Sequence, residues 1–255
     1  MPIKLALWQG ESVAGDRGRA LSEIARASRA AGQMGAAAIT FPELFLSGYE
    51  RDDLGELAMT QDEVAGHLSP MAQRAACAIC IGYPERLAEG IANSAICLGA
   101  DGQVLANHRK IQLFGQTEAT RFVAGDRYTT FALAGRKAAV LICYDVEFAP
   151  HIAALQGQGV DLILAPTANM RPFEHVGHHV VPTMAANHAL SIVYANYCGR
   201  EAHLEYFGES SITGPDGRML ARAGQHPCLL IADLPDDYEP AHLSTQSRDF
   251  RQVAP

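Results

Sequence analysis

The stretch LICYDVEF, residues 141–148, ends an apolar run in a cysteine that is followed at once by acidic residues. Cys143 closes the segment AAVLIC, whose continuous apolar character is typical of a buried strand. Asp145 and Glu147 should disfavour a thiolate at Cys143, because a nearby negative charge raises the pKa of a thiol. Cys143 is therefore either an inert core residue or a nucleophile whose base and positive charge come from elsewhere in the chain.

Around this stretch, strand and helix patterns alternate along the whole chain. Asp-Gly turns join two pairs of strands as hairpins, in NSAICLGADGQVLANHRK and SSITGPDGRMLA. Hairpins mixed with helical crossovers predict an α/β fold with two mixed sheets and helices outside both. No linker or low-complexity segment divides the chain, so we expect one domain over residues 1–255. Helix patterns fall at residues 16–34, 62–76, 149–156 and 182–189, and further strand patterns at 3–9, 36–41, 77–83, 129–143, 160–166, 190–197 and 228–234.

The composition is that of a globular protein, with 48% apolar and 19% charged residues over 255 positions. A net charge of -8 without a Lys/Arg cluster argues against nucleic acid as a partner. No apolar run approaches the roughly 18–20 residues that span a bilayer, so no membrane partner is expected. The first residues read as a strand rather than a secretory leader, which predicts a cytoplasmic protein. Four of the six cysteines, in apolar strand-like surroundings, are expected to be buried reduced thiols: Cys77, Cys80, Cys97 and Cys198.

Three segments share one layout, in which a buried strand ends and a reactive side chain follows. Glu43 follows AITFP, Lys110 follows VLANHR, and Cys143 follows AAVLI. Side chains at the carboxyl edge of a sheet converge on the crevice where such folds bind ligands. There a glutamate can take the thiol proton, and a lysine can stabilise the oxygen that becomes negative during attack. The backbone N–H of Tyr144 is the natural second donor to that oxygen.

The segments FPELFLSGY (41–49), HRKIQLFG (108–115) and LICYDVEF together resemble the three motif regions of the nitrilase superfamily of carbon–nitrogen hydrolases. The resemblance runs from Ile3 to about Leu234. It implies a four-layer α-β-β-α sandwich with two mixed β-sheets, which forms a homodimer or higher homo-oligomer through its helical faces. It also implies that neither a cofactor nor a metal is needed.

By match of motif, the resemblance implies Glu43 as general base, Lys110 as oxyanion stabiliser and Cys143 as nucleophile. A second family glutamate falls at Glu118, either as a catalytic group or as a structural carboxylate that orients Lys110. The implied reaction is acyl transfer from an amide to Cys143, loss of ammonia, and hydrolysis of the thioester. Each residue alone has a plainer interpretation: a buried thiol, a turn glutamate, or a solvated lysine. Three motifs in register favour the catalytic interpretation.

Glu147 bears on the substrate, because many superfamily members have arginine at this position. A carboxylate there favours a substrate with an ammonium group. The segments C-Y-D-x-E-F and APTANM most resemble the branch of 5-aminopentanamidase and stereoselective amidases. We therefore expect a small aliphatic amide, such as 5-aminopentanamide, with Tyr144, Glu147 and Asn169 at the substrate. An ion pair of Glu147 with Arg171 or Arg200 is the alternative, and Asp145 is expected to cap the helix that follows.

Two other clusters are expected to be structural. CAIC, residues 77–80, has redox-motif spacing but lies inside a strand pattern. EHVGHH, residues 174–179, places histidines within helical reach of one another, yet no carboxylate or thiol motif completes a metal site. The rival functions are nitrile hydrolysis or N-carbamoyl amine cleavage in the same superfamily, and a catalytically silent binding or scaffold protein.

Overall fold

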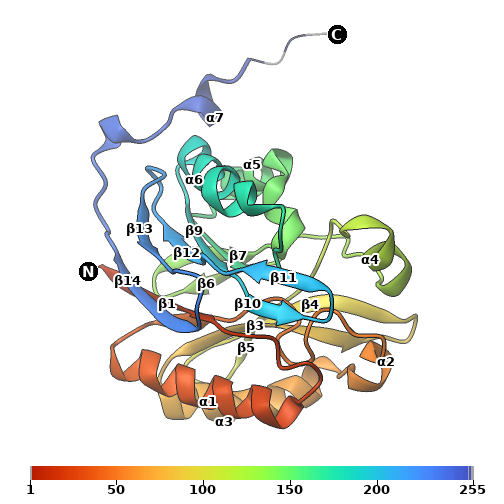
Figure 1. The fold of residues 1–255 in the computed structure, drawn as a ribbon. Coiled ribbons are helices and arrows are strands. Elements are labelled where there is room, and N and C mark those ends of the chain that lie inside the picture. Colours follow the sequence, from red (N-terminus) through yellow and green to blue (C-terminus); the bar gives the residue numbers. More distant parts are fainter. Residues whose placement is uncertain (1, 252, 254–255) are drawn as a thin grey trace.

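Two mixed β-sheets stack face to face, and helices cover their outer faces (Figure 1). The computed structural model describes residues 2–251 and 253. The first sheet has six strands, in the order β14 (Cys228–Leu234), β1 (Ile3–Gln9), β2 (Ala38–Thr40), β3 (Ala78–Arg86), β4 (Ile91–Leu98) and β5 (Val104–Arg109) among the described residues. The second also has six within that part of the chain: β13 (Met219–Arg222), β12 (Ser211–Thr213), β9 (Ser191–Ala195), β8 (Leu162–Pro166), β7 (Arg136–Val140) and β6 (Thr130–Leu133).

Three apolar layers separate the sheets and helices and confirm the four-layer α-β-β-α arrangement. One layer, which includes Ile24 and Ile79, lies between the first sheet and the helices α1 and α3. A second layer, with Leu7 and Leu164, fills the space between the two sheets. The third, with Ile152, lies between the second sheet and helices α5 and α6. The longer helices are α1 (Arg17–Gln33), α3 (Gln61–Ala75), α5 (Ala149–Gly157) and α6 (Val181–His188), and the shorter ones are α2 (Leu54–Leu57), α4 (Gly115–Arg121) and α7 (Gln246–Asp249).

The strand directions bring several carboxyl ends to one edge of the molecule. Strands β1, β2 and β3 are parallel, as are β7, β8 and β9. Strand β5 points the same way as β3, because β4 runs antiparallel to both. The edges of the two sheets meet where the backbone N–H of Glu43, beyond β2, donates to the carbonyl of Thr167, beyond β8. Residues that follow β2, β5, β7 and β8 therefore surround one place.

Local sequence signals explain where the helices begin. The Asp16 side chain accepts a hydrogen bond from the backbone N–H of Arg19 at the start of α1. Thr60 and Glu63 form a capping box at the start of α3. The helices and strands expected from sequence are confirmed, with bounds that differ by a few residues. The hairpin of β10 (Cys198–Glu201) and β11 (Leu204–Phe207), and the short helices α2 and α4, were not expected.

The four cysteines expected in the core are buried free thiols, and the segment 77–80 enters β3. Over residues 2–251 and 253, none of the helices has the length and apolar character needed to cross a membrane. The cytoplasmic location and the one-domain organisation stay predictions.

Candidate active site

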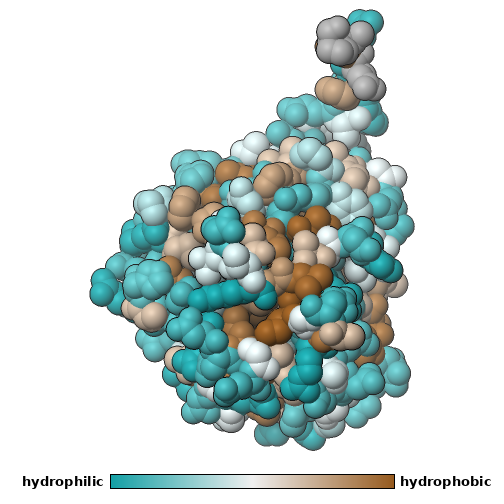
Figure 2. Space-filling view, turned by 90° about the vertical axis from the view of Figure 1, so that its right-hand side faces the viewer, coloured by the Kyte–Doolittle hydropathy of each residue, from teal (hydrophilic) through white to brown (hydrophobic). Residues whose placement is uncertain are grey.

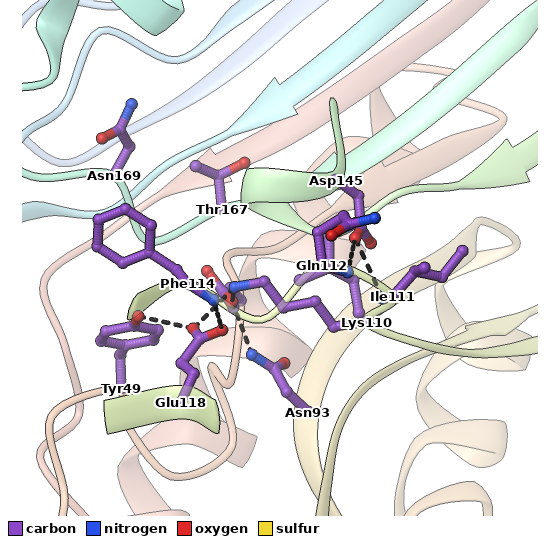
Figure 3. A network of polar contacts seen from close by, with 12 residues as sticks. Tyr49, Asn93, Lys110, Ile111, Gln112, Phe114, Glu118, Asp145, Thr167 and Asn169 are labelled. Carbon is purple, nitrogen blue, oxygen red and sulfur yellow. Dashed lines mark hydrogen bonds and ion pairs between the residues drawn. The ribbon is translucent and has the colours of Figure 1, made fainter. Parts of the chain in front are cut away.

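Lys110 is the centre of a buried charge cluster built from separate segments of the chain. Its ammonium Nζ donates to Oε1 of Glu43 at 2.6 Å and to Oε1 of Glu118 at 2.7 Å. Glu118 also accepts hydrogen bonds from the hydroxyl of Tyr49 and the backbone N–H of Phe114, both at 2.7 Å (Figure 3). All three charged side chains are buried. The structure thus brings together the predicted glutamate, lysine and second glutamate, and each carboxylate has a defined hydrogen-bond partner.

Glu43 lies in a tight loop directly after β2. The side-chain amide Nδ2 of Asn93 donates to its Oε1 at 2.7 Å, so both Asn93 and Lys110 orient the carboxylate. Strand β3 passes close beneath the loop at Gly82, where an added Cβ would lie 2.2 Å from the backbone nitrogen of Leu44. Only a glycine permits this approach, because any side chain at Gly82 would displace the loop that carries Glu43.

Cys143 stands at a strained turn between β7 and α5. Its φ of +46° lies in the left-handed region, which non-glycine residues adopt rarely. It is the first residue of a 3-10 turn, Cys143–Glu147, that starts soon after β7 ends. The residue is half-buried. Strained backbone of this kind persists where the surrounding structure holds it, and it often marks functional sites.

Burial and nearby charges shift the pKa of the Cys143 thiol. Burial and the carboxylate of Glu43 raise the pKa of Cys143 well above the ordinary value for a thiol, and Lys110 offsets only part of this. Burial also raises the pKa of Glu43, with Lys110 opposing it. Burial alone would lower the pKa of Lys110, but Glu43 and Glu118 together raise it, so the ammonium stays charged. A thiol with a raised pKa can act as a nucleophile only with the help of a base. Glu43 is a carboxylate close enough to affect the pKa of Cys143.

Asp145 does not cap the helix after the turn, so that expectation is wrong. Its buried carboxylate instead accepts backbone N–H bonds from Ile111 at 3.1 Å, Gln112 at 2.6 Å and Ile142 at 3.0 Å (Figure 3). The ring of the buried His108 lies 3.6 Å away. Asp145 therefore links the segment just after Lys110 to the residue just before Cys143. Three backbone N–H groups satisfy the hydrogen-bonding needs of its carboxylate.

A cavity of about 240 Å³ opens beside Cys143 and is called the Cys143 cavity below. Three residues expected at the substrate, Tyr144, Glu147 and Asn169, line it together with Cys143. Figure 2 shows the hollowed face of the molecule, with hydrophobic residues in the hollow and hydrophilic residues around it. The volume lies below the roughly 300–1,000 Å³ of clefts for drug-sized ligands, which favours a small substrate. The remaining lining residues are Tyr49, Phe114, Ala168, Met170, Phe173 and His175.

Glu147 does not pair with either arginine considered as its structural partner. Arg171 and Arg200 both bind the carboxylate of Glu205, at 3.0 and 2.8 Å. Burial raises the pKa of Glu147, and His175 opposes this effect. The ion-pair alternative is therefore wrong, and the carboxylate faces the Cys143 cavity.

Asn169 is held by a buried polar network that sequence reasoning missed. Its backbone N–H donates to Oδ1 of Asn196 at 2.8 Å, and its side-chain Nδ2 donates to the hydroxyl of Tyr194 at 2.9 Å. Ser210 holds Asn196 in place: the backbone N–H of Asn196 donates to the Ser210 hydroxyl at 2.9 Å. The same hydroxyl donates to Oε1 of Gln9 at 2.8 Å. The network fixes the position of Asn169 in the cavity wall through contacts between distant segments.

Aromatic side chains in the cavity wall were also missed. Tyr49 and Phe114 belong to the first two motif segments, so the motifs offered a signal for them. Phe173 and His175 come from the segment RPFEHVGHH after Asn169, which departs from the resembled branch and was expected to shape the pocket. The rings of Phe114 and Phe173 meet edge to face, with centroids 5.6 Å apart.

The histidine-rich segment leads into α6, and its His175 lines the Cys143 cavity. His178 pairs with Glu209, and the segment Val176–Val180 forms a π-helical turn that leads into α6. No group of three or more potential metal ligands occurs among residues 2–251 and 253.

Comparison with known proteins relates the chain to amide-cleaving enzymes. The family model described as carbon-nitrogen hydrolase matches residues 4–242. A protein named "Hydrolase in pqqF 5'region" from Pseudomonas protegens is 42% identical over 77% of this chain and 70% of its own length. The (R)-stereoselective amidase of a Pseudomonas species is 28% identical over 83% of this chain and 76% of its own. A mutant amidase from Nesterenkonia sp. AN1, solved in complex with butyramide, superposes with a TM-score of 0.88 at 30% identity, over 98% of this chain and 94% of that one.

Proposed function

The chain belongs to the carbon–nitrogen hydrolase family, and from this premise we propose that it hydrolyses a small aliphatic amide to a carboxylate and ammonia through a thioester on Cys143. The family match, the amidase relatives and the amidase structures together identify a hydrolase of carbon–nitrogen bonds in amides. The observation that carries the proposal is the Lys110 ammonium bound to Glu43 at 2.6 Å, at the edge where Cys143 enters a cavity.

In the first half of the reaction, Cys143 becomes acylated. Glu43 takes the thiol proton as Sγ forms a bond to the amide carbon, and the carbonyl oxygen becomes negative. Lys110 and the backbone N–H of Tyr144 stabilise this oxygen. The tetrahedral intermediate collapses when the carbon–nitrogen bond breaks. Glu43 passes its proton to the leaving nitrogen, ammonia departs, and the acyl group remains on Cys143 as a thioester.

In the second half, water releases the acid. Glu43 takes a proton from a water molecule that attacks the thioester carbon. Lys110 again stabilises the oxyanion. The carbon–sulfur bond then breaks and Glu43 returns the proton to Sγ, which restores the enzyme. The carboxylic acid leaves and gives its remaining proton to the solvent, which yields the carboxylate. This sequence needs no redox step, since no atom changes oxidation state.

A panel of substrates tests the reaction class. We expect ammonia release from small aliphatic amides, and loss of that release in Cys143→Ala. Cys228→Ala is the matched control, because Cys228 is a half-buried free cysteine outside the Cys143 cavity. Mass spectrometry of protein quenched during turnover should show the mass of the acyl group on the peptide that contains Cys143. Unchanged amide hydrolysis in Cys143→Ala would contradict the mechanism, and activity confined to nitriles or N-carbamoyl amines would reassign the reaction.

The Glu147 carboxylate favours an ω-amino amide such as 5-aminopentanamide. It lines the Cys143 cavity and is not paired with Arg171 or Arg200. An ammonium at the far end of the acyl chain would supply the missing positive partner. Asn169, which also lines the cavity, would add a polar contact beside it.

Glu147→Gln tests this preference. A charge-assisted contact contributes about 1.5–3 kcal/mol, so kcat/KM for 5-aminopentanamide should fall about 10- to 100-fold. Hexanamide, which has equal length and no charge, should change much less. The wild-type preference for the amine should also weaken at acidic pH, because burial raises the pKa of Glu147 and protonation removes its charge. Equal losses on both substrates would assign Glu147 a structural role.

The chain is further proposed to form a homodimer through the outer faces of α5 and α6. A groove of about 660 Å³ runs between these helices and α7, and small side chains such as Ala149 and Ala153 line it. Phe250, which also lines the groove, is 79% exposed. A second copy of the chain would cover this surface.

A further inference from the structure

Glu201 on β10 is a buried carboxylate that takes no part in the proposed reaction. It is 5% exposed and does not line the Cys143 cavity. Within the described part of the chain it forms no ion pair, and it accepts hydrogen bonds on one oxygen, Oε2. Burying a carboxylate without a cation is costly, so these hydrogen bonds are the contacts that hold its charge in place.

Oε2 of Glu201 connects two segments of the cavity wall. It accepts a hydrogen bond from the backbone N–H of Tyr49 at 3.1 Å, and another from the hydroxyl of Tyr206 at 2.8 Å. Tyr206 lies on β11 and forms a β-bridge with Met170. Tyr49 and Met170 both line the Cys143 cavity. One buried carboxylate therefore holds together two lining segments that are far apart in the sequence.

The other oxygen, Oε1, packs directly against the loop that carries Tyr49. An added Cβ on Gly48 would lie 2.3 Å from Oε1 of Glu201, and Gly48 has a φ of +87°. Only a glycine suits this conformation and this close approach. The length of the Glu201 side chain thus matches the position of the loop, and a shorter side chain would leave the Tyr49 N–H without its acceptor.

Tyr49 carries this position into the charge cluster. Its hydroxyl donates to Oε1 of Glu118 at 2.7 Å, and the same oxygen accepts from Nζ of Lys110 at 2.7 Å (Figure 3). In the proposed reaction the Lys110 ammonium stabilises the oxyanion, which requires that it points at that oxygen. A shift of the Tyr49 backbone would move its hydroxyl, then Glu118, and finally the ammonium.

We propose that Glu201 is a positioning residue of the active site: it holds the Tyr49 backbone so that the Tyr49 hydroxyl fixes Glu118 against Lys110. Glu201 itself touches neither the substrate nor the reacting atoms. The reach of its acceptor oxygen matters more than its charge. The inference rests on the proposed amidase function and adds a residue to it.

Two conservative variants separate reach from charge, assayed on the primary amide that the wild-type enzyme cleaves fastest. Glu201→Gln keeps the length of the side chain and an acceptor oxygen, so kcat should stay within about fivefold of wild type. Glu201→Asp keeps the charge but is one methylene shorter. Its kcat should fall at least tenfold, because a displacement of about 1 Å at a catalytic group can cost 10²-fold.

A double-mutant cycle tests the route through Tyr49. Tyr49→Phe removes the hydroxyl but keeps the backbone N–H that binds Glu201, and it should itself lower kcat. In the Tyr49→Phe background, Glu201→Asp should cost less than about threefold, because members of one hydrogen-bond network are coupled whereas independent sites are additive.

Leu68→Ala is the control for stability. Leu68 is a buried residue of α3 in the layer between this helix and the first sheet. Its truncation leaves a cavity, so the thermal midpoint should fall at least as far as in Glu201→Asp. At a temperature where every variant is folded, as circular dichroism would show, kcat of Leu68→Ala should equal that of wild type.

The outcomes separate this inference from the proposed function. Suppose the wild-type enzyme cleaves amides, but Glu201→Asp loses no more kcat than Glu201→Gln. The positioning role is then wrong and the proposed function stands. A folded Glu201→Gln variant with kcat lowered more than tenfold, or an equal loss from Glu201→Asp with and without the Tyr49 hydroxyl, would also overturn it. Absence of activity on every amide would overturn the proposed function itself.

Discussion

Glu43 is expected to affect Cys143 in two ways, as a base and as a nearby negative charge, and an experiment can separate the two effects. Glu43 is the proposed general base, and its charge also raises the pKa of the Cys143 thiol. Glu43→Gln should therefore lower amide hydrolysis about 10²–10⁴-fold, the usual contribution of a general base. The same change should shift the pH midpoint of Cys143 alkylation by iodoacetamide to lower pH, because it removes the negative charge of Glu43 that raises the pKa of the thiol.

Peptide mass spectrometry across a pH series would measure that midpoint. Glu56→Gln, at an exposed position of α2, is the matched control and should change neither activity nor alkylation. An unchanged or higher midpoint in Glu43→Gln would mean that Glu43 does not act on the thiol in the resting protein.

Among the elements, strand β3 determines where the Glu43 loop can lie. Gly82→Ala would place a Cβ 2.2 Å from the backbone nitrogen of Leu44, so the loop must move. We expect kcat/KM to fall at least tenfold, because a displacement of about 1 Å at a catalytic group can cost 10²-fold. Gly66→Ala is the control, since an added Cβ there, inside α3, meets no atom within 4 Å.

Gly66→Ala should raise the free energy of unfolding by about 0.5–1 kcal/mol, because alanine favours a helix. Urea unfolding monitored by circular dichroism would measure both variants. Full activity in Gly82→Ala would show that the loop tolerates the displacement.

The connection between β5 and the turn after β7 depends on one carboxylate. Asp145→Asn keeps the shape of the side chain but replaces one acceptor oxygen with an amide donor, which must face backbone N–H groups. We expect kcat to fall at least tenfold with a smaller change in KM, since hydrogen bonds to a charged group contribute about 1.5–3 kcal/mol each. Stopped assays at saturating and limiting amide would separate the two constants.

The control for that change is Asp126→Asn. Asp126 lies in the segment FVAGD, residues 122–126, which follows α4. It is exposed and binds only Arg127 among its ion-pair partners in the described residues. Its loss should leave kcat within about twofold, because exposed ion pairs contribute roughly 0–1 kcal/mol. If Asp145→Asn were equally silent, the contact of Asp145 with the two segments would not be needed to position Lys110 and Cys143.

For the whole molecule, the proposed homodimer predicts that a charge added to the groove beside α5 and α6 separates the subunits, whereas the same charge on another face does not. Ala153→Arg on the exposed side of α5 places a charge in the groove and should convert the dimer to a monomer. Ala119→Arg, exposed on α4, adds the same charge elsewhere and should leave the dimer intact. Size-exclusion chromatography with light scattering gives the mass directly. A monomeric wild-type protein would contradict the proposal.

The sequence predicted the layers of the fold well, because apolar periodicity is a local property of each segment. The strand ends that carry Glu43, Lys110 and Cys143 were found in the same way. The hairpin β10–β11 was not predicted, because apolar and polar residues alternate only weakly in its segment. Its turn contains Ala202 with a φ of +50°, a conformation that usually signals glycine, and alanine gives no such signal. Leu204 of its second strand lines a hollow together with residues of α4, a contact that only the packing creates.

Residue identity and spacing by themselves determined that this chain builds two mixed sheets, and that a glutamate, a lysine and a thiol each follow a strand, at Glu43, Lys110 and Cys143. Only the tertiary structure decided which partners those groups and their neighbours contact. It turned Asp145 from a helix cap into a link between two segments more than 30 positions apart, left Glu147 facing the cavity without an arginine, and joined Tyr49 to Glu118 across 69 positions. The reason is physical: a short segment determines its own backbone, whereas the partners of a buried charge come from whichever distant segments the packing places beside it.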